Sequence, residues 1–221
     1  MTAKSLLRRT FFALLLSLVM TGPATAGELP PELLAAATRL SSHDTVRARF
    51  EQTKSSVLFM EDVVRTGTLA LRRTDGRLLW TYDDGPSFLM ADGRFYPAGK
   101  SAAEAGKDGA SGFSMPGAGH MTSVLQAVFT LDPDALAAHF NARVTEPGTF
   151  ELTPKDAAAK GLFKLVTLTV GGEPLAVTRT AMDEPTGDST VIAFSEVDVG
   201  SALPPEHFMT PAERTASEGK K

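Results

Sequence analysis

The histidines of the chain are scattered and form no pair at the spacing of metal ligands. They stand at His43, His120, His139 and His207, whereas protein zinc sites draw their ligands from short, regular intervals. We interpret each of them as a surface or turn residue. The sequence also contains no cysteine, which excludes a thiol nucleophile, a disulfide bond and a lipidated N-terminal cysteine.

A serine in a glycine-rich stretch gives the nearest approach to a hydrolase motif. It lies at the centre of Gly112-Phe113-Ser114-Met115-Pro116-Gly117, but a proline stands where a nucleophile elbow needs its second glycine. Gly117-Ala118-Gly119 lacks the third glycine of a dinucleotide site and does not follow a strand. We interpret both stretches as loop.

Two acidic pairs, Asp83-Asp84 and Asp183-Glu184, fall in predicted turns, where such side chains bond their own backbone. They are weak candidates for the paired carboxylates of a glycosidase. We therefore expect a protein that is not an enzyme and that needs no metal or cofactor. A periplasmic hydrolase acting on lipid or glycan is the alternative from another class.

Arg73 stands on a strand face that is otherwise apolar. Gly67, Leu69 and Leu71 alternate with their neighbours, and Arg73 continues their face. If this face points inward, the guanidinium needs hydrogen-bond acceptors, because a buried unpaired charge costs several kcal/mol. The alternative is an arginine at the strand end that bends out to water. Arg72 lies on the opposite face.

Alternation with a period of two predicts a β-rich chain. Asp75-Gly76 marks a hairpin turn, and 162–170 is apolar on both faces. A curved sheet with helices on its concave side would account for such a strand, and so would an ordinary packed barrel. The predicted strands cover 46–51, 66–73, 78–82, 87–91, 150–153, 162–170, 175–182 and 190–199.

Three short helices are predicted between these strands. The first opens at Pro30-Pro31-Glu32 and carries an apolar stripe. A second covers 121–129, and a third begins with Asp132 as N-cap, has Pro133 in its first turn and runs to about Phe140. The stretch 97–119 is rich in Gly, Ala and Ser, and we interpret it as a mobile loop.

The N-terminus has the pattern of a secretory signal peptide. Basic residues precede an apolar run over 11–20, and Ala24-Thr25-Ala26 fits a cleavage site. The run is too short to cross about 30 Å of hydrocarbon as a membrane anchor. We expect a leader over 1–26 and one domain over 27–221. Cleavage removes three basic residues and changes the formal charge from −4 to −7, which disfavours nucleic acid as a partner.

The order of motifs resembles that of the outer-membrane lipoprotein carriers, the LolA-like proteins, and this chain would be a divergent member. The likeness spans about 29–211. The matching segments are Val46-Arg47-Ala48-Arg49-Phe50-Glu51-Gln52-Thr53, Gly67-Thr68-Leu69-Ala70-Leu71-Arg72-Arg73, Leu79-Trp80-Thr81-Tyr82, Ala91-Asp92-Gly93, Phe150-Glu151-Leu152-Thr153-Pro154 and His207-Phe208-Met209-Thr210-Pro211.

The resemblance implies a mainly β fold with short helices: an open, unclosed antiparallel β-barrel whose apolar cavity lies under a helical lid. It implies a periplasmic carrier without cofactor, here expected to be a monomer. Its cargo would be the acyl chains of lipoproteins or a related acylated lipid. Its partners would be an inner-membrane lipoprotein-releasing transporter and an outer-membrane receptor. A periplasmic sensor of lipids with a similar half-barrel is the alternative among binding proteins.

Site residues also follow from the resemblance. Arg73 matches the family's arginine that hydrogen-bonds the lid, although Thr74 replaces the proline that usually follows it. The glycine- and alanine-rich stretch after Asp92-Gly93 is a second departure, and it leaves the cargo open between a lipoprotein and a glycolipid or other acylated product. The expected cavity residues are Phe50, Leu69, Leu71, Leu78, Trp80, Phe88, Leu125 and Val128.

Overall fold

The computed structural model describes residues 29–58, 61–99 and 118–218. The expected leader over 1–26, Ser114 and most of the predicted loop over 97–119 lie outside these residues. The bounds of that loop were wrong at both ends, because Pro97 and Ala98 belong to a strand and a helix already begins at Ala118.

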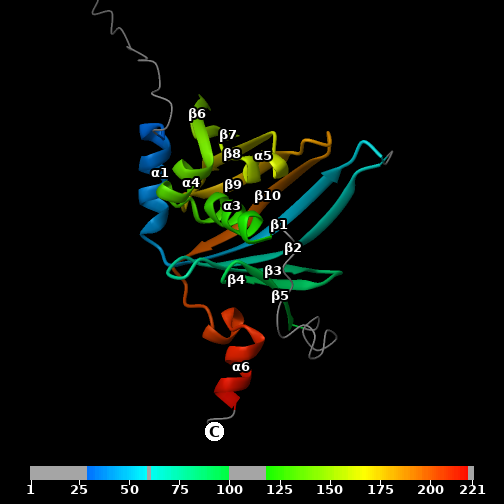
Figure 1. Ribbon diagram of the computed structural model, residues 1–221. Helices are drawn as coiled ribbons and strands as arrows, with labels where there is room; N and C mark the ends of the chain where they lie inside the picture. The colour runs from blue at the N-terminus through cyan, green and yellow to red at the C-terminus, as the bar shows by residue number, and fades with distance from the viewer. Residues whose placement is uncertain (1–28, 59–60, 100–117, 219–221) are drawn as a thin grey trace, which may run out of the picture.

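A single antiparallel sheet of ten strands forms most of the molecule (Figure 1). Its order is β5-β4-β3-β2-β1-β10-β9-β8-β7-β6. The edge strands β5 and β6 do not pair with each other, so the barrel is open, as predicted. The strands are β1 (Thr45–Ser55), β2 (Val63–Arg72), β3 (Arg77–Tyr82), β4 (Ser87–Ala91), β5 (Arg94–Ala98), β6 (Phe140–Glu146), β7 (Thr149–Pro154), β8 (Leu165–Gly171), β9 (Ala176–Asp183) and β10 (Ser189–Val199).

Short helices lie against the concave face of this sheet (Figure 1). The helices of the described residues are α1 (Pro31–Ser41), α3 (Ala118–Thr130), α4 (Pro133–His139), α5 (Ala157–Leu162) and α6 (Pro211–Glu218), with a 3₁₀ turn, η1 (Pro205–Phe208). Asp132 caps α4 by accepting a hydrogen bond from the Ala135 amide at 2.8 Å, as the sequence predicted. We call α3 and α4 the lid.

The sheet is apolar on both faces because other elements of the chain pack against each face. Leu69 and Leu71 face the main core with α1, α3, α4 and α5. Ala70, between them, belongs to a smaller cluster on the other face, which is closed by Phe208 of η1. A curved sheet covered by helices, rather than a closed packed barrel, therefore explains the two-faced strands.

The segment predicted as one strand over 162–170 is a helix followed by a strand. α5 ends at Leu162, and β8 begins only at Leu165. Asp156 caps this helix by accepting a hydrogen bond from the Ala159 amide at 2.8 Å. Phe163 packs into the same core as Val166, instead of on the opposite face, because the chain turns between helix and strand.

An apolar cavity and a polar cleft beside the lid

An apolar cavity of about 230 Å³ lies between the concave face and α3. Leu125 and Phe129 of α3 close one side of it, and strands from both halves of the sheet form the rest. Small-molecule sites in proteins have this apolar character, with few polar groups. The lining residues are Gln52, Leu78, Trp80, Tyr82, Phe88, Met90, Phe95, Leu125, Phe129, Met182, Thr190 and Ile192.

Aromatic side chains form the floor of this cavity. The ring of Phe50 lies 4.2 Å from that of Trp80 and 5.5 Å from that of Tyr82, measured between centroids. Gly67 makes room for Phe50, since a Cβ there would lie 2.5 Å from the Phe50 Cζ atom. The Tyr82 hydroxyl donates to Gln52 Oε1 at 2.7 Å, and burial raises the pKa of Tyr82.

A second apolar cavity, of about 40 Å³, lies along β1, β2 and β10. Phe129 lines both cavities and separates them. Its ring centroid lies 5.7 Å from that of Trp80 and 6.3 Å from that of Phe194. The lining residues of the smaller cavity are Leu40, Val46, Ala48, Leu69, Leu71, Arg73, Phe129, Ala176, Val177, Phe194, Val197 and Val199.

Arg73 follows the last residue of β2 and reaches the C-terminal end of α3. Its Nη1 donates to the carbonyl oxygen of Thr130, the last residue of that helix. Carbonyls at a helix end lack an internal partner, and a guanidinium supplies the missing donor. Burial lowers the pKa of Arg73, and the charge of Asp44 opposes this shift. We call the Arg73–Thr130 hydrogen bond the latch.

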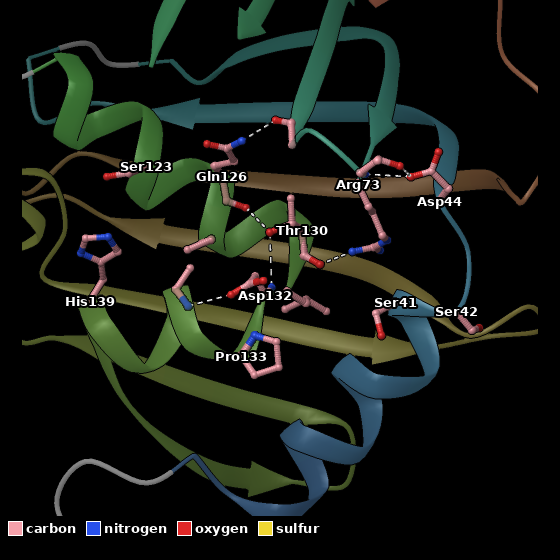
Figure 2. Close-up of a pocket in the computed structure, with 15 residues that line it drawn as sticks. Ser41, Ser42, Asp44, Arg73, Ser123, Gln126, Thr130, Asp132, Pro133 and His139 are labelled. Carbon is pink, nitrogen blue, oxygen red and sulfur yellow. Dashed lines mark hydrogen bonds between the residues drawn. The ribbon is translucent and has the colours of Figure 1, made fainter. Parts of the chain in front are cut away.

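A polar cleft of about 660 Å³ opens beside the latch (Figure 2). The end of α1, the turn between β2 and β3, and the lid helices form its walls. His139 lines the cleft, and its Nδ1 lies 2.8 Å from Asp156 Oδ2. The Ala159 amide and His139 lower the pKa of Asp156. Arg73 lines both this cleft and the smaller apolar cavity.

The predicted cavity residues divide among three places. Leu78, Trp80, Phe88 and Leu125 line the larger cavity, and Leu69 and Leu71 line the smaller one. Phe50 is 1% exposed and lies beneath the aromatic floor, and Val128 is equally buried in the lid without lining either cavity.

Phe129, Phe194, Met182 and Ile192 line the cavities but were not among the predicted residues. Phe129 could have been predicted from the sequence, because it follows Leu125 by one helical turn and therefore lies on the same face of the helix. The cavity residues of β9 and β10 could not have been predicted, since the sequence alone does not indicate that these strands face the lid.

The described residues were also compared with the patterns of a metal site and of a membrane-spanning helix. Among them, His, Cys, Asp and Glu form no group of three or more that could hold a metal ion. No helix within these residues is long and apolar enough to cross a membrane.

Likeness to known proteins is found among solved structures. No protein-family model matches the sequence, and no curated protein is similar to it. A chain in the MucA/MucB complex of Pseudomonas aeruginosa aligns with 82% of this chain at 16% identity and a TM-score of 0.45, and this chain spans 62% of its length. Lipoprotein LppX of Mycobacterium tuberculosis aligns over 79% of this chain and 98% of its own, at 14% identity and a TM-score of 0.35.

A LolA superfamily protein of Nitrosomonas europaea aligns over 80% of this chain and 97% of its own, at 10% identity and a TM-score of 0.39. All three TM-scores lie below 0.5.

Proposed function

We propose that the protein is a carrier that holds the acyl chain of a lipoprotein or related acylated lipid between its sheet and its lid. The observation that carries this proposal is the pair of apolar cavities separated by Phe129. Each methylene moved from water into such a cavity gains about 0.8 kcal/mol. An acyl chain therefore needs a protein cover to leave a membrane.

The described state is a closed one. Its larger cavity holds about 230 Å³, which is below the roughly 300–1,000 Å³ of typical ligand sites. Withdrawal of Phe129 would join the two cavities, and Phe129 directly precedes Thr130, which the latch holds. Opening the latch and enlarging the cavity are therefore one movement.

The strength of the latch suits a carrier. A hydrogen bond to a charged group contributes about 1.5–3 kcal/mol. Burial of about four methylenes outweighs it, at about 0.8 kcal/mol each. A lid held in this way is closed when empty and is opened by cargo.

The proposed route runs through the periplasm, from an inner-membrane transporter that releases the cargo to an outer-membrane receptor. The resemblance to the lipoprotein carriers supports this route, as does the signal-peptide pattern over 1–26. On this proposal the protein is a monomer and not an enzyme, and burial alone retains the cargo.

A fluorescent fatty-acid probe tests the proposal. Wild-type protein should bind it saturably and release it to unlabelled fatty acid. Leu125→Asp places a carboxylate in the cavity wall, and a charge without a partner in an apolar site is costly. We expect this variant to bind the probe at least about tenfold more weakly, as a loss of 1.4 kcal/mol or more would give.

Leu58→Asp is the matched control. Leu58 is 85% exposed and lies in the turn that follows β1, so the same substitution there should leave binding unchanged. Failure of the folded wild-type protein to bind any fatty acid, or equal binding by Leu125→Asp and wild type, would refute the proposal.

A further inference from the structure

The polar cleft continues the path of the apolar cavities. Arg73 lines the cleft and the smaller cavity, and Phe129 lines the smaller and the larger cavity. A molecule with its acyl chain past Phe129 would therefore place its polar end beside Arg73, in the cleft of Figure 2. Resting on the proposed carrier function, we propose that this cleft binds the uncharged, hydroxyl-bearing headgroup of a glycolipid.

Hydrogen-bond acceptors predominate on the cleft wall. Asp44 uses Oδ1 to accept from the Thr74 amide at 2.8 Å and from the Thr74 hydroxyl. Asp132 uses Oδ1 to accept from the Ala135 amide at 2.8 Å. No described residue donates to the second oxygen of either carboxylate, so both oxygens are open to a ligand that donates.

Two hydroxyls on the same wall are also set as acceptors. Ser41 donates its hydroxyl hydrogen to the Thr38 carbonyl at 2.8 Å, and Ser42 donates to the Arg39 carbonyl at 2.7 Å. A hydroxyl has one hydrogen to donate, so toward the cleft these side chains offer lone pairs only. Sugar and glycerol hydroxyls are the matching donors.

The charges of the cleft restrict the kind of headgroup that can bind there. The cleft holds the carboxylates of Asp44 and Asp132 against the single guanidinium of Arg73. The titratable group facing them from α4 is His139, whose Nδ1 is paired with Asp156. Two carboxylates repel a phosphate or another anionic headgroup. A trimethylammonium cation lies beside the like charge of Arg73 and has no N–H to donate to the open carboxylate oxygens. A neutral headgroup that donates hydrogen bonds meets neither obstacle.

Arg73 supplies the contact for the link between chain and headgroup. Its Nε is buried and has no hydrogen-bond partner among the described residues, and such an orphan donor calls for an acceptor. An acyl ester places a carbonyl oxygen at the junction of its apolar and polar parts. That junction falls where Arg73 separates the smaller cavity from the cleft.

The experiment compares lipids that share dioleoyl chains and differ in headgroup, each displacing a fluorescent fatty-acid probe from the full chain. The headgroups are galactosyl, phosphatidylglycerol, a trimethylammonium cation and a methyl ether that lacks any donor. We expect the galactosyl lipid to displace the probe at about tenfold lower concentration than the other three, the equivalent of one good hydrogen-bonding contact.

Asp44→Asn with Asp132→Asn tests the assigned groups. Asparagine keeps an oxygen for Thr74 and still serves as an N-cap for α4, so the fold should survive, as circular dichroism can show. The double variant should lose most of the galactosyl advantage. Asp134→Asn, on the exposed side of α4 and outside the cleft, should retain it.

The outcomes separate this inference from the carrier proposal. Three results would overturn the headgroup proposal and leave the carrier proposal intact. They are equal displacement by all four lipids, preference for the anionic or cationic lipid, and an undiminished galactosyl advantage in the double variant. A wild-type protein that does not bind even the fatty-acid probe would instead overturn the carrier proposal itself.

Discussion

Arg73 connects the end of β2 to the end of α3, two elements that are far apart in the sequence. Its side chain crosses from the end of β2 to the last carbonyl of α3, and its backbone amide donates to the Asp44 carbonyl at 2.7 Å. Arg72 points to the other face, where it pairs with Asp75 and lies 4.8 Å from the centroid of the Phe208 ring. The adjacent residues Arg72 and Arg73 thus lie on different faces of the sheet and make different contacts.

Replacing Arg73 by leucine should weaken closure of the empty lid without loss of the fold. The variant loses a charge-assisted hydrogen bond of about 1.5–3 kcal/mol and gains an apolar mouth that retains an acyl chain. We expect uptake at least as strong as in the wild type and slower release. Stopped-flow fluorescence gives the dissociation rate directly.

Arg72→Leu is the control for this prediction. It removes contacts on the outer face and should lower stability slightly without changing release. Slower release by Arg72→Leu together with normal release by Arg73→Leu would contradict the assignment of the latch.

The residues of this site were predictable to different degrees. Arg73 could be placed because a charge on an apolar strand face needs acceptors. The family resemblance implied that this arginine bonds the end of a lid helix. It did not indicate that the acceptor is the carbonyl of Thr130. Asp44 and Asp132 were not foreseen as lining a common cleft, because nothing in the sequence brings the end of α1 beside the lid.

At the scale of elements, β1 and β2 are held in register by a large residue facing a small one. Phe50 pairs with Gly67, and a Cβ at Gly67 would lie 2.1 Å from the Thr81 carbonyl oxygen. The ring of Phe50 covers the glycine and supports the cavity floor. The alternation of β2 predicted its inward face, but the need for glycine there appears only with the neighbouring strands in place.

Gly67→Ala should therefore destabilise the protein. Overpacking a filled core costs about 1–3 kcal/mol, and here one obstacle is backbone, which cannot rotate away. Gly161→Ala is the matched control, since nothing lies within 4 Å of a Cβ there and alanine in a helix is favoured by about 0.5–1 kcal/mol. Urea unfolding should move in opposite directions for the two variants, and a neutral Gly67→Ala would contradict this account.

The C-terminal helix α6 was missed although the sequence carries its signature. Thr210-Pro211-Ala212-Glu213 is a capping box with proline in the first turn. The Thr210 amide donates to Glu213 Oε2 at 2.8 Å, and Arg77 Nη1 donates to the same oxygen at 2.6 Å. These contacts tie α6 to the outer end of β3. The helix α5, of six residues, was harder to foresee because it is too short to show a clear period. The strand β6 was missed although Phe140, Ala142 and Val144 alternate with polar residues.

Glu213 makes stability depend on pH in the acidic range. Arg77 and the Thr210 amide lower the pKa of Glu213 from 4.5 to about 2. A carboxyl whose pKa is lower in the folded state stabilises fully above its unfolded pKa. This contribution is lost as the pH falls from about 4.5 to about 2.

Glu213→Gln should lower stability at neutral pH by about 0.5–1 kcal/mol, the range of a half-exposed ion pair, and should flatten the acid dependence. Thermal unfolding between neutral and acidic pH measures both effects. Glu206→Gln is the control, since the Glu206 carboxylate has no ion pair among the described residues. An acid profile of Glu213→Gln that matches the wild type would contradict the assigned role.

The whole molecule is a curved sheet with a different cover on each face. The lid and the other helices of the concave face leave apolar cavities beneath them, whereas Phe208 of η1 packs into the outer cluster of the opposite face. Strand alternation predicted a β-rich chain, and the family resemblance, carried by the order of motifs, implied the open barrel. The resemblance also indicated which face of β2 and β3 holds the cavity, but the part played by β9 and β10 could not be predicted until the helices were placed.

Quenching of Trp80 by a brominated acyl chain tests the central claim most directly. Trp80 is the single tryptophan of the chain, and it lines the larger cavity beneath the lid. Bromine quenches indole fluorescence only at contact, so the signal reports where the chain lies as well as whether it binds. We predict saturable quenching by dibromostearate, reversed by unlabelled stearate and shifted to at least about tenfold higher concentration in Leu125→Asp. Saturable binding of dibromostearate without any quenching of Trp80 would show that the acyl chain lies elsewhere and would contradict the account.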